Sequence, residues 1–342
     1  MVAISVVMPT YNTEVAILKE AVESILNQTF ADFEFIIIDD GSTNDAPAYL
    51  DALTDPRVRI IRNQTNIGIT KSLNIGFRAA QGKYIARMDA DDISFPQRFE
   101  KQYAFMESHL DVIVCGTDIE RIGARSGKSQ NRIDDMELYK CILPFYNPGP
   151  MHPTALFRNE ILQEKHIQYN EELRYAQDYD MWATIVHHGR IVIMDDVLLQ
   201  CRTHNNQVSI THNEAQMQCD EKIHKRLLIE LMDSVSDEEV HMHSVYSTLW
   251  RYHDTMITPQ INQWYDRLIK ANDLRHIYDT KKFRLIIEQI KKELISRTYK
   301  VKKTAIGKVA LNFRYLSFFS AVEFTLEICK MKIDGLIRNH RD

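Results

Sequence analysis

The sequence predicts an α/β fold, a mostly parallel sheet with helices on both faces, followed by a helical C-terminal region. Apolar strand patterns alternate with amphipathic helix patterns through the first third of the chain. Such strand patterns fade after about residue 215, and the later segments have helical periodicity. We therefore expect one domain at 1–215 and a helical region at 216–342.

Each expected strand is a short apolar run, and each expected helix repeats apolar residues three and four positions apart. The expected strands of the sheet are 4–9, 33–39, 57–62, 83–88 and 111–116, with one or two more at 190–202. The expected helices are 14–28, 45–53, 70–82, 97–108, 175–189, 216–232, 236–254, 258–272 and 279–299. Between 120 and 150 the pattern loosens, and NPGPMHP at 147–153 predicts a loop rich in proline and glycine.

Charge is distributed unevenly along the 342 residues. Residues 291–342 hold twelve Lys/Arg and five Asp/Glu, a net of +7, whereas the remainder has 30 and 42, a net of −12. A basic tail on an acidic body predicts an anionic contact, such as the inner face of a membrane. A solvated basic face of a helical bundle, or a surface for partner docking or homo-oligomer formation, fits equally. Nucleic acid is disfavoured because no recognised binding module accompanies the charge.

Cysteine usage and the N-terminus predict a cytoplasmic protein. The five cysteines are odd in number, widely spaced and without a CxxC pair, so we expect reduced thiols. The opening MVAISVVMPTYN begins as a strand and lacks the features of a signal peptide. No apolar run reaches the roughly 18–20 residues that a membrane helix needs.

Acidic residues follow two expected strands directly. Asp89, Asp91 and Asp92 come after strand 83–88, and the segment DDGST comes after strand 33–39. Because carboxyl ends of parallel strands share one edge, where ligands bind, these groups should lie together. Carboxylates are ligands that Mg²⁺ and Mn²⁺ accept beside substrate phosphates. The alternative is a pair of polar turns that cap the following helices.

Five motifs occur in a family-like order: VVMPTYN, DDGST, NIGITKSLNIG, AAQGKYIARMDADD and FPQRFEKQ. Together they resemble the inverting family 2 glycosyltransferases, which have a GT-A fold with a Rossmann-like sheet, over about residues 1–210. The resemblance implies transfer of a hexosyl or N-acetylhexosaminyl group from a nucleotide diphosphate, with UDP expected, to a hydroxyl. It implies Mn²⁺ or Mg²⁺ on the diphosphate. It also implies a glycan or lipid-linked acceptor in bacterial surface polysaccharide, capsule or lipopolysaccharide assembly. Peripheral membrane contact through the basic segment 291–342 would fit a lipid-linked acceptor.

Carried over by position, the motifs imply a donor site. Pro9 and Tyr11 would line the nucleobase pocket, Asp40 would accept a hydrogen bond from the base with Asp39 beside it, and Lys71 would lie near the nucleotide. Residues implied to hold the diphosphate or the metal are Asp89, Asp91, Arg202 and His204, with Asp92 as a third acid.

The segment AQDYDMW at 176–182 resembles the family's EDYDLW, whose acidic pair at a helix start supplies the general base. This aligns Asp178 as the base, with Asp180 as the alternative, and Gln177 stands where the family has Glu. Without the resemblance, both acids would be read as favouring the helix dipole. His152, Gln177 and Trp182 are implied on the acceptor side, with a buried structural histidine and a core tryptophan as the alternatives.

Rival functions lack their sequence signatures. A sugar-nucleotide pyrophosphorylase needs a glycine-rich basic loop after the first strand, and an NAD-dependent oxidoreductase needs GxGxxG there. The segment MPTYNTEV has neither. The remaining alternative is a non-catalytic nucleotide-sugar-binding or scaffold protein on the same fold, which Gln177 alone favours.

Overall fold

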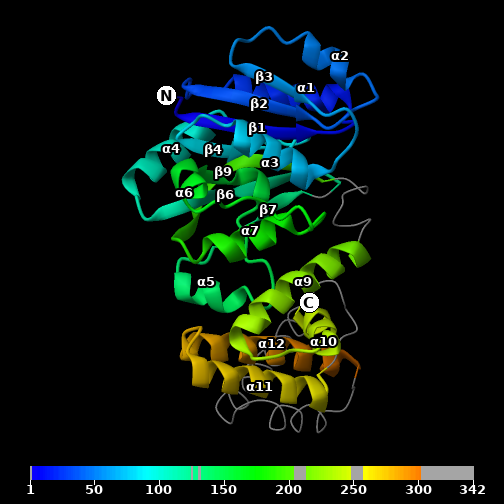
Figure 1. Cartoon of the computed structure of the whole chain (residues 1–342), viewed down its shortest axis with the longest axis vertical. Helices are drawn as coiled ribbons and strands as arrows, with labels where there is room; N and C mark the ends of the chain where they lie inside the picture. The colour runs from blue at the N-terminus through cyan, green and yellow to red at the C-terminus, as the bar shows by residue number, and fades with distance from the viewer. Residues whose placement is uncertain (1, 125, 130–131, 204–212, 248–256, 302–342) are drawn as a thin grey trace, which may run out of the picture. The chain divides into compact units, whose positions relative to one another are not determined.

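The computed structural model describes residues 2–124, 126–129, 132–203, 213–247 and 257–301, the side chains at 129, 213 and 297–301 excepted. The chain forms two compact units. The first combines Met1–Tyr139 with Asn147–Ile223, and the second combines Lys140–Tyr146 with the described residues after Ile223. Figure 1 labels the helices and strands of both units.

The sheet of the first unit begins with four parallel strands in the order β3-β2-β1-β4. Their bounds are β1 Ile4–Thr10, β2 Phe33–Asp39, β3 Val58–Arg62 and β4 Tyr84–Arg87. These strands match four of the apolar runs in the sequence. The expected mostly parallel α/β arrangement is therefore confirmed.

The sheet continues from β4 through β8, β6 and β9 to the short β5 at its edge. Here β6 and β9 are parallel, whereas β8 is antiparallel to both β4 and β6. The strand β8 has no signal in the sequence, because its three residues are too few to show a period. The bounds are β5 Ile93–Ser94, β6 Val112–Gly123, β7 Gly127–Ser129, β8 Leu156–Arg158 and β9 Arg190–Thr203.

Helices cover both faces of the sheet because successive side chains of its strands point to opposite sides. Ile4, Val6 and Met8 of β1 pack in one core cluster with residues of α1, α2 and α4. The intervening Val7 faces α3, where a Cβ on Gly76 would lie 2.4 Å from Val7 Cγ1. The helices of this unit are α1 Val15–Leu26, α2 Ala46–Asp51, α3 Ile69–Ala79, α4 Arg98–Ser108, α5 Met136–Ile142, η1 His152–Thr154, α6 Asn159–Glu164 and α7 Gln177–Ile185, with α5 ending in the second unit.

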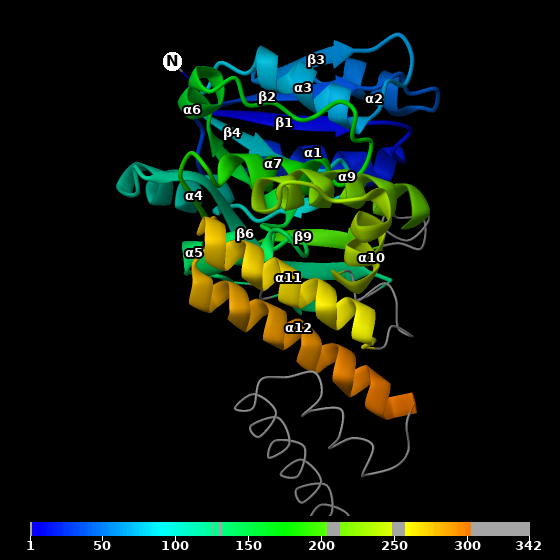
Figure 2. The ribbon, with the colours of Figure 1, turned by 60° about the horizontal axis from the view of Figure 1, so that its bottom comes forward.

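The second unit is helical, as the sequence predicts for this part of the chain. Its helices are α9 Asn213–Leu231, which begins in the first unit, α10 Asp237–Ser247, α11 Pro259–Arg275 and α12 Thr280–Val301, and α11 and α12 lie side by side (Figure 2). His243 is buried at its centre, where Trp264 Nε1 donates to Nδ1 (3.0 Å) and Nε2 donates to the carbonyl of Pro144 (2.6 Å). Burial lowers the pKa of His243 to about 4, so the ring is neutral.

Two expectations concern the membrane and the cysteines. No helix in the described ranges is long and apolar enough to cross a membrane. Most of the basic segment 291–342 lies outside the described residues. Cys115, Cys201 and Cys219 are free thiols.

Candidate active site

A crevice is expected where the strand order reverses between β1 and β4. The chain leaves β1 towards β2 on one side, whereas β4 pairs with β1 on the other. Loops after the two strands therefore diverge at their carboxyl ends, which is where open α/β sheets bind ligands. Two residues border this edge at the end of β1. Pro9 is buried, whereas the side chain of Tyr11 is 49% exposed. The acidic triplet borders it from β4.

The triplet Asp89, Asp91 and Asp92 forms one cluster, in which a carboxylate oxygen from each residue lies within 4.8 Å of the others. Burial, followed by the charges of the other two acids, raises the pKa of Asp92 well above its ordinary value. Its Oδ1 accepts from the backbone N–H of Arg202 (2.8 Å), but its Oδ2 is buried and finds no hydrogen bond among the described residues. Carboxylate oxygens crowded together in this way fit a hard divalent cation.

Arg202, near the end of β9, lies against the same cluster. Its Nε donates to the backbone carbonyl of Asp91 (2.9 Å), and its guanidinium pairs with Glu20 of α1. The fold thus brings Arg202 against Asp91 and Asp92, which lie 111 and 110 positions earlier in the sequence. His204, the other predicted ligand from this segment, lies outside the described residues.

Arg87, the last residue of β4, was missed by sequence analysis. Its side chain is 3% exposed and pairs with Asp89. Burial raises the pKa values of Asp92 and Asp178, and the positive charge of Arg87 opposes both rises. The same buried guanidinium therefore acts on the acid cluster and on the predicted base. The available signal was a charged residue inside KYIARM, an otherwise apolar run that should be buried.

The two acids of DDGST accept hydrogen bonds from this loop and from the loop that follows β3. Asp40 is buried, and its carboxylate accepts from Asn63 Nδ2 (2.7 Å) and from the backbone N–H groups of Ile67 (3.0 Å) and Gly68 (2.9 Å). Buried Asp39 accepts from the N–H of Ser42 (3.0 Å). Three donors on one carboxylate leave Asp40 about one of its four acceptor positions for a nucleobase.

This loop and the one after β1 are joined, which shapes the predicted nucleobase side. The N–H of Asn12 donates to Ser42 Oγ (2.9 Å), and Asn12 Oδ1 accepts from the N–H of Thr43 (2.8 Å). Gly41 has φ +75°, and a Cβ there would lie 2.6 Å from the backbone of Thr65, so the turn requires glycine. Lys71 is exposed in the first turn of α3.

Asp178 lies in the first turn of α7, next to Gln177, and is partly buried. Burial raises the pKa of its carboxyl above the ordinary value, while a hydrogen bond from Asn147 Nδ2 (2.9 Å) opposes the rise. Asn147 comes from the proline-rich loop and was not singled out in the sequence. A carboxylate made more basic by burial, yet reachable, suits a general base.

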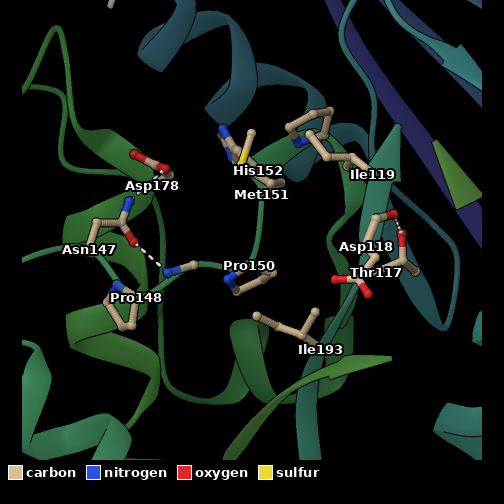
Figure 3. A pocket seen from close by; sticks show the side chains of 12 residues that line it. Thr117, Asp118, Ile119, Asn147, Pro148, Pro150, Met151, His152, Asp178 and Ile193 are labelled. Atoms are coloured by element: carbon tan, nitrogen blue, oxygen red, sulfur yellow. Dashed lines mark hydrogen bonds between the residues drawn. The ribbon is translucent and has the colours of Figure 1, made fainter. Parts of the chain in front are cut away.

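Asp178 forms part of the wall of a pocket with a volume of about 200 Å³ (Figure 3). The other walls come from the end of the proline-rich loop and from β6 and β9. The lining residues are Thr117, Asp118, Ile119, Asn147, Pro148, Gly149, Pro150, Met151, His152, Pro153, Asp178 and Ile193.

Two predicted acceptor-side residues are buried. His152 is 7% exposed and shares a 2.7 Å hydrogen bond with the hydroxyl of Tyr169, and burial holds its pKa well below the ordinary value. It therefore contributes a neutral ring to the pocket. Trp182 is fully buried and stacks on Phe157 with ring centroids 5.6 Å apart. This is the core position that the sequence left as the alternative for Trp182.

Known proteins are similar to this chain in sequence and in fold. Residues 5–165 match the family model described as glycosyl transferase family 2. An uncharacterized glycosyltransferase of Haemophilus influenzae is 32% identical over 263 residues, 73% of this chain and 80% of the relative. The amylovoran biosynthesis glycosyltransferase AmsE of Erwinia amylovora is 29% identical over 215 residues, 60% of this chain and 78% of the relative. The crystal structure of S. aureus TarS 1–349 in complex with UDP-GlcNAc has a TM-score of 0.60 at 18% identity, covering 88% of each chain.

Proposed function

This chain belongs to glycosyl transferase family 2, and on that premise we propose that it is an inverting enzyme with Asp178 as its general base. The proposed donor is a nucleotide diphosphate sugar, with UDP as the nucleotide and a hexosyl or N-acetylhexosaminyl group as the sugar. The proposed acceptor is a hydroxyl of a glycan or lipid-linked glycan in bacterial polysaccharide, capsule or lipopolysaccharide assembly.

The observation that carries the proposal is the environment of Asp178. Its carboxylate borders a pocket, its pKa is raised by burial, and Asn147 orients it. In the proposed reaction, this carboxylate removes the proton of the acceptor hydroxyl as that oxygen bonds to the anomeric carbon. The bond from this carbon to the diphosphate oxygen breaks on the opposite face, which inverts the configuration. The diphosphate leaves with the electron pair of that bond.

The acid cluster fits the metal that the family implies. Asp89 and Asp91 would hold the cation, and Asp92 Oδ2 supplies a further buried oxygen without a hydrogen bond among the described residues. A bound Mn²⁺ or Mg²⁺ stabilises negative charge on the leaving diphosphate. Arg202 donates hydrogen bonds to the carbonyl of Asp91 and to the carboxylate of Asp92. The buried guanidinium of Arg87 forms an ion pair with Asp89.

Donor and pathway rest on relatives. The TarS crystal structure contains UDP-GlcNAc, which supports UDP, and AmsE acts in amylovoran biosynthesis, which supports a polysaccharide acceptor. Contact of the basic segment 291–342 with an anionic membrane face would suit a lipid-linked acceptor. A non-catalytic nucleotide-sugar-binding protein is the alternative, since Gln177 replaces one acid of the family pair.

Two measurements test this function. Calorimetric titration of UDP, GDP and dTDP, with Mn²⁺ and with chelator, should give metal-dependent binding of one nucleotide. Asp178→Asn should then lower the transfer rate by about 10²–10⁴-fold, the usual contribution of a general base, with unchanged nucleotide affinity. Asp180→Asn, on the same helix turn, is the matched control. A rate loss confined to Asp180→Asn would identify Asp180 as the base instead. If the wild type binds nucleotide but transfers no sugar, the non-catalytic alternative is favoured.

A further inference from the structure

A second carboxylate lines the pocket on the wall that faces Asp178. Asp118, in β6, is 3% exposed, and burial raises its pKa. Its Oδ2 has no hydrogen bond among the described residues. Figure 3 shows its carboxylate directed into the pocket, across from Asp178. A buried acceptor atom that faces a cavity is a group that a ligand hydroxyl can satisfy.

Arg132, which pairs with Asp118, is shared with another carboxylate. Arg132 Nε lies 3.5 Å from Asp118 Oδ2, and the same guanidinium pairs with Asp195. These three side chains therefore carry a net charge of −1, and Asp178 adds another negative charge. None of the lining residues in the described ranges is Lys or Arg, and His152 is neutral. Arg87, which acts on Asp178 from within the core, is paired with Asp89.

The rest of the lining is mostly apolar. It includes Ile119, Ile193 and three prolines, with Thr117, Asn147 and the neutral ring of His152 as polar groups. A sugar ring matches such a lining, because its hydroxyls point outward from the ring edge and its faces present C–H groups. A pocket volume of about 200 Å³ has room for one sugar unit.

We propose that this pocket receives the terminal sugar of the acceptor, that Asp118 accepts a hydrogen bond from one of its hydroxyls, and that this sugar bears no negative charge. The proposal rests on the proposed function, since it takes Asp178 as the base that borders the acceptor. A carboxylate or phosphate on the bound sugar would meet two carboxylates in a partly desolvated space, where like charges repel strongly. Neutral sugars are therefore selected, and uronic acids and sugar phosphates are rejected.

Ligand-observed NMR on the full chain with UDP and Mn²⁺ tests the proposal. The probes are methyl glycosides of glucose, galactose and mannose, each paired with its uronic acid counterpart. At least one neutral glycoside should bind with a Kd tenfold or more below that of its acidic partner. Asp118→Asn should reduce this ratio at least fivefold. Asp111→Asn is the matched control, because it removes an exposed, Arg190-paired carboxylate beside the other end of β6 and should leave the ratio unchanged.

A second variant guards against a folding defect in Asp118→Asn. Ile193→Phe, which fills the pocket from β9, should weaken binding of both members of a pair. Three results would each overturn the proposal. They are equal or tighter binding of the uronic acids, an unchanged Kd ratio in Asp118→Asn, and no binding of any neutral glycoside. Nucleotide titration separates the two claims: absent nucleotide binding with retained discrimination among glycosides would refute the donor side alone.

Discussion

Asp40→Asn tests whether this carboxylate mainly holds the loop that follows β3. Asp40 is 3% exposed and accepts three hydrogen bonds, from Asn63 Nδ2 and from the N–H groups of Ile67 and Gly68. Hydrogen bonds to a charged group contribute about 1.5–3 kcal/mol each. Asparagine keeps one oxygen for two of them, but its amide would face the N–H of Gly68, donor against donor. We therefore expect a cost of about 2–4 kcal/mol for the closed loop.

Hydrogen exchange measured by mass spectrometry reports on this loop directly. Because every 1.4 kcal/mol is a tenfold change in an equilibrium, exchange across residues 63–68 should accelerate roughly 30- to 700-fold. Asp51→Asn is the control, since this exposed carboxylate pairs with Arg62 at the surface, where ion pairs contribute about 0–1 kcal/mol. Unchanged exchange in Asp40→Asn, together with lost nucleotide binding, would refute the reasoning and show that the carboxylate mainly serves the nucleobase.

Two further predictions concern charge around the base and the acid cluster. Asp178 must be ionised to act as a base, so the transfer rate should fall as pH drops through its raised pKa. The hydrogen bond from Asn147 lowers that pKa, so Asn147→Ala should move the acidic limb of the kcat profile to higher pH, and a limb that stays in place would contradict the assignment. Arg87→Gln removes the buried partner of Asp89. Breaking a buried ion pair costs about 3–5 kcal/mol of unfolding free energy, and because Asp89 is 30% exposed we expect a loss at the lower end of that range. Urea denaturation measures it, and a loss below about 0.5 kcal/mol would mean that the pair is not structural.

The sequence predicted the edge of the sheet that carries the site, because strand periodicity and strand-end chemistry are local properties. The runs at 4–9, 33–39 and 83–88 correspond to β1, β2 and β4, and their polar ends meet where the strand order reverses. Asp89, Asp91 and Arg202 lie together as the family motifs imply.

Other parts of the site depend on partners that no local pattern reveals. β8 enters the sheet between β4 and β6 through only three residues, so its position follows from pairing rather than from its own period. Asn147 meets Asp178 only in the folded chain, where the two side chains lie on the same side of the pocket and share a hydrogen bond (Figure 3). Arg87 and Asp118 are ordinary charged residues in the sequence, and only their burial makes them important.

The sequence by itself determined the family, the order of strands and helices along the first unit, and the residue types available at the strand ends. These follow from short-range periodicity and from motifs whose residues are close together in the chain. Tertiary structure alone decided which of those groups are already satisfied by the protein and which face a cavity. Asp40 is engaged by three donors, whereas Asp118 has a buried oxygen without a hydrogen bond in the described structure. The difference arises because hydrogen bonding and desolvation depend on what the completed fold places within about 3 Å of each oxygen.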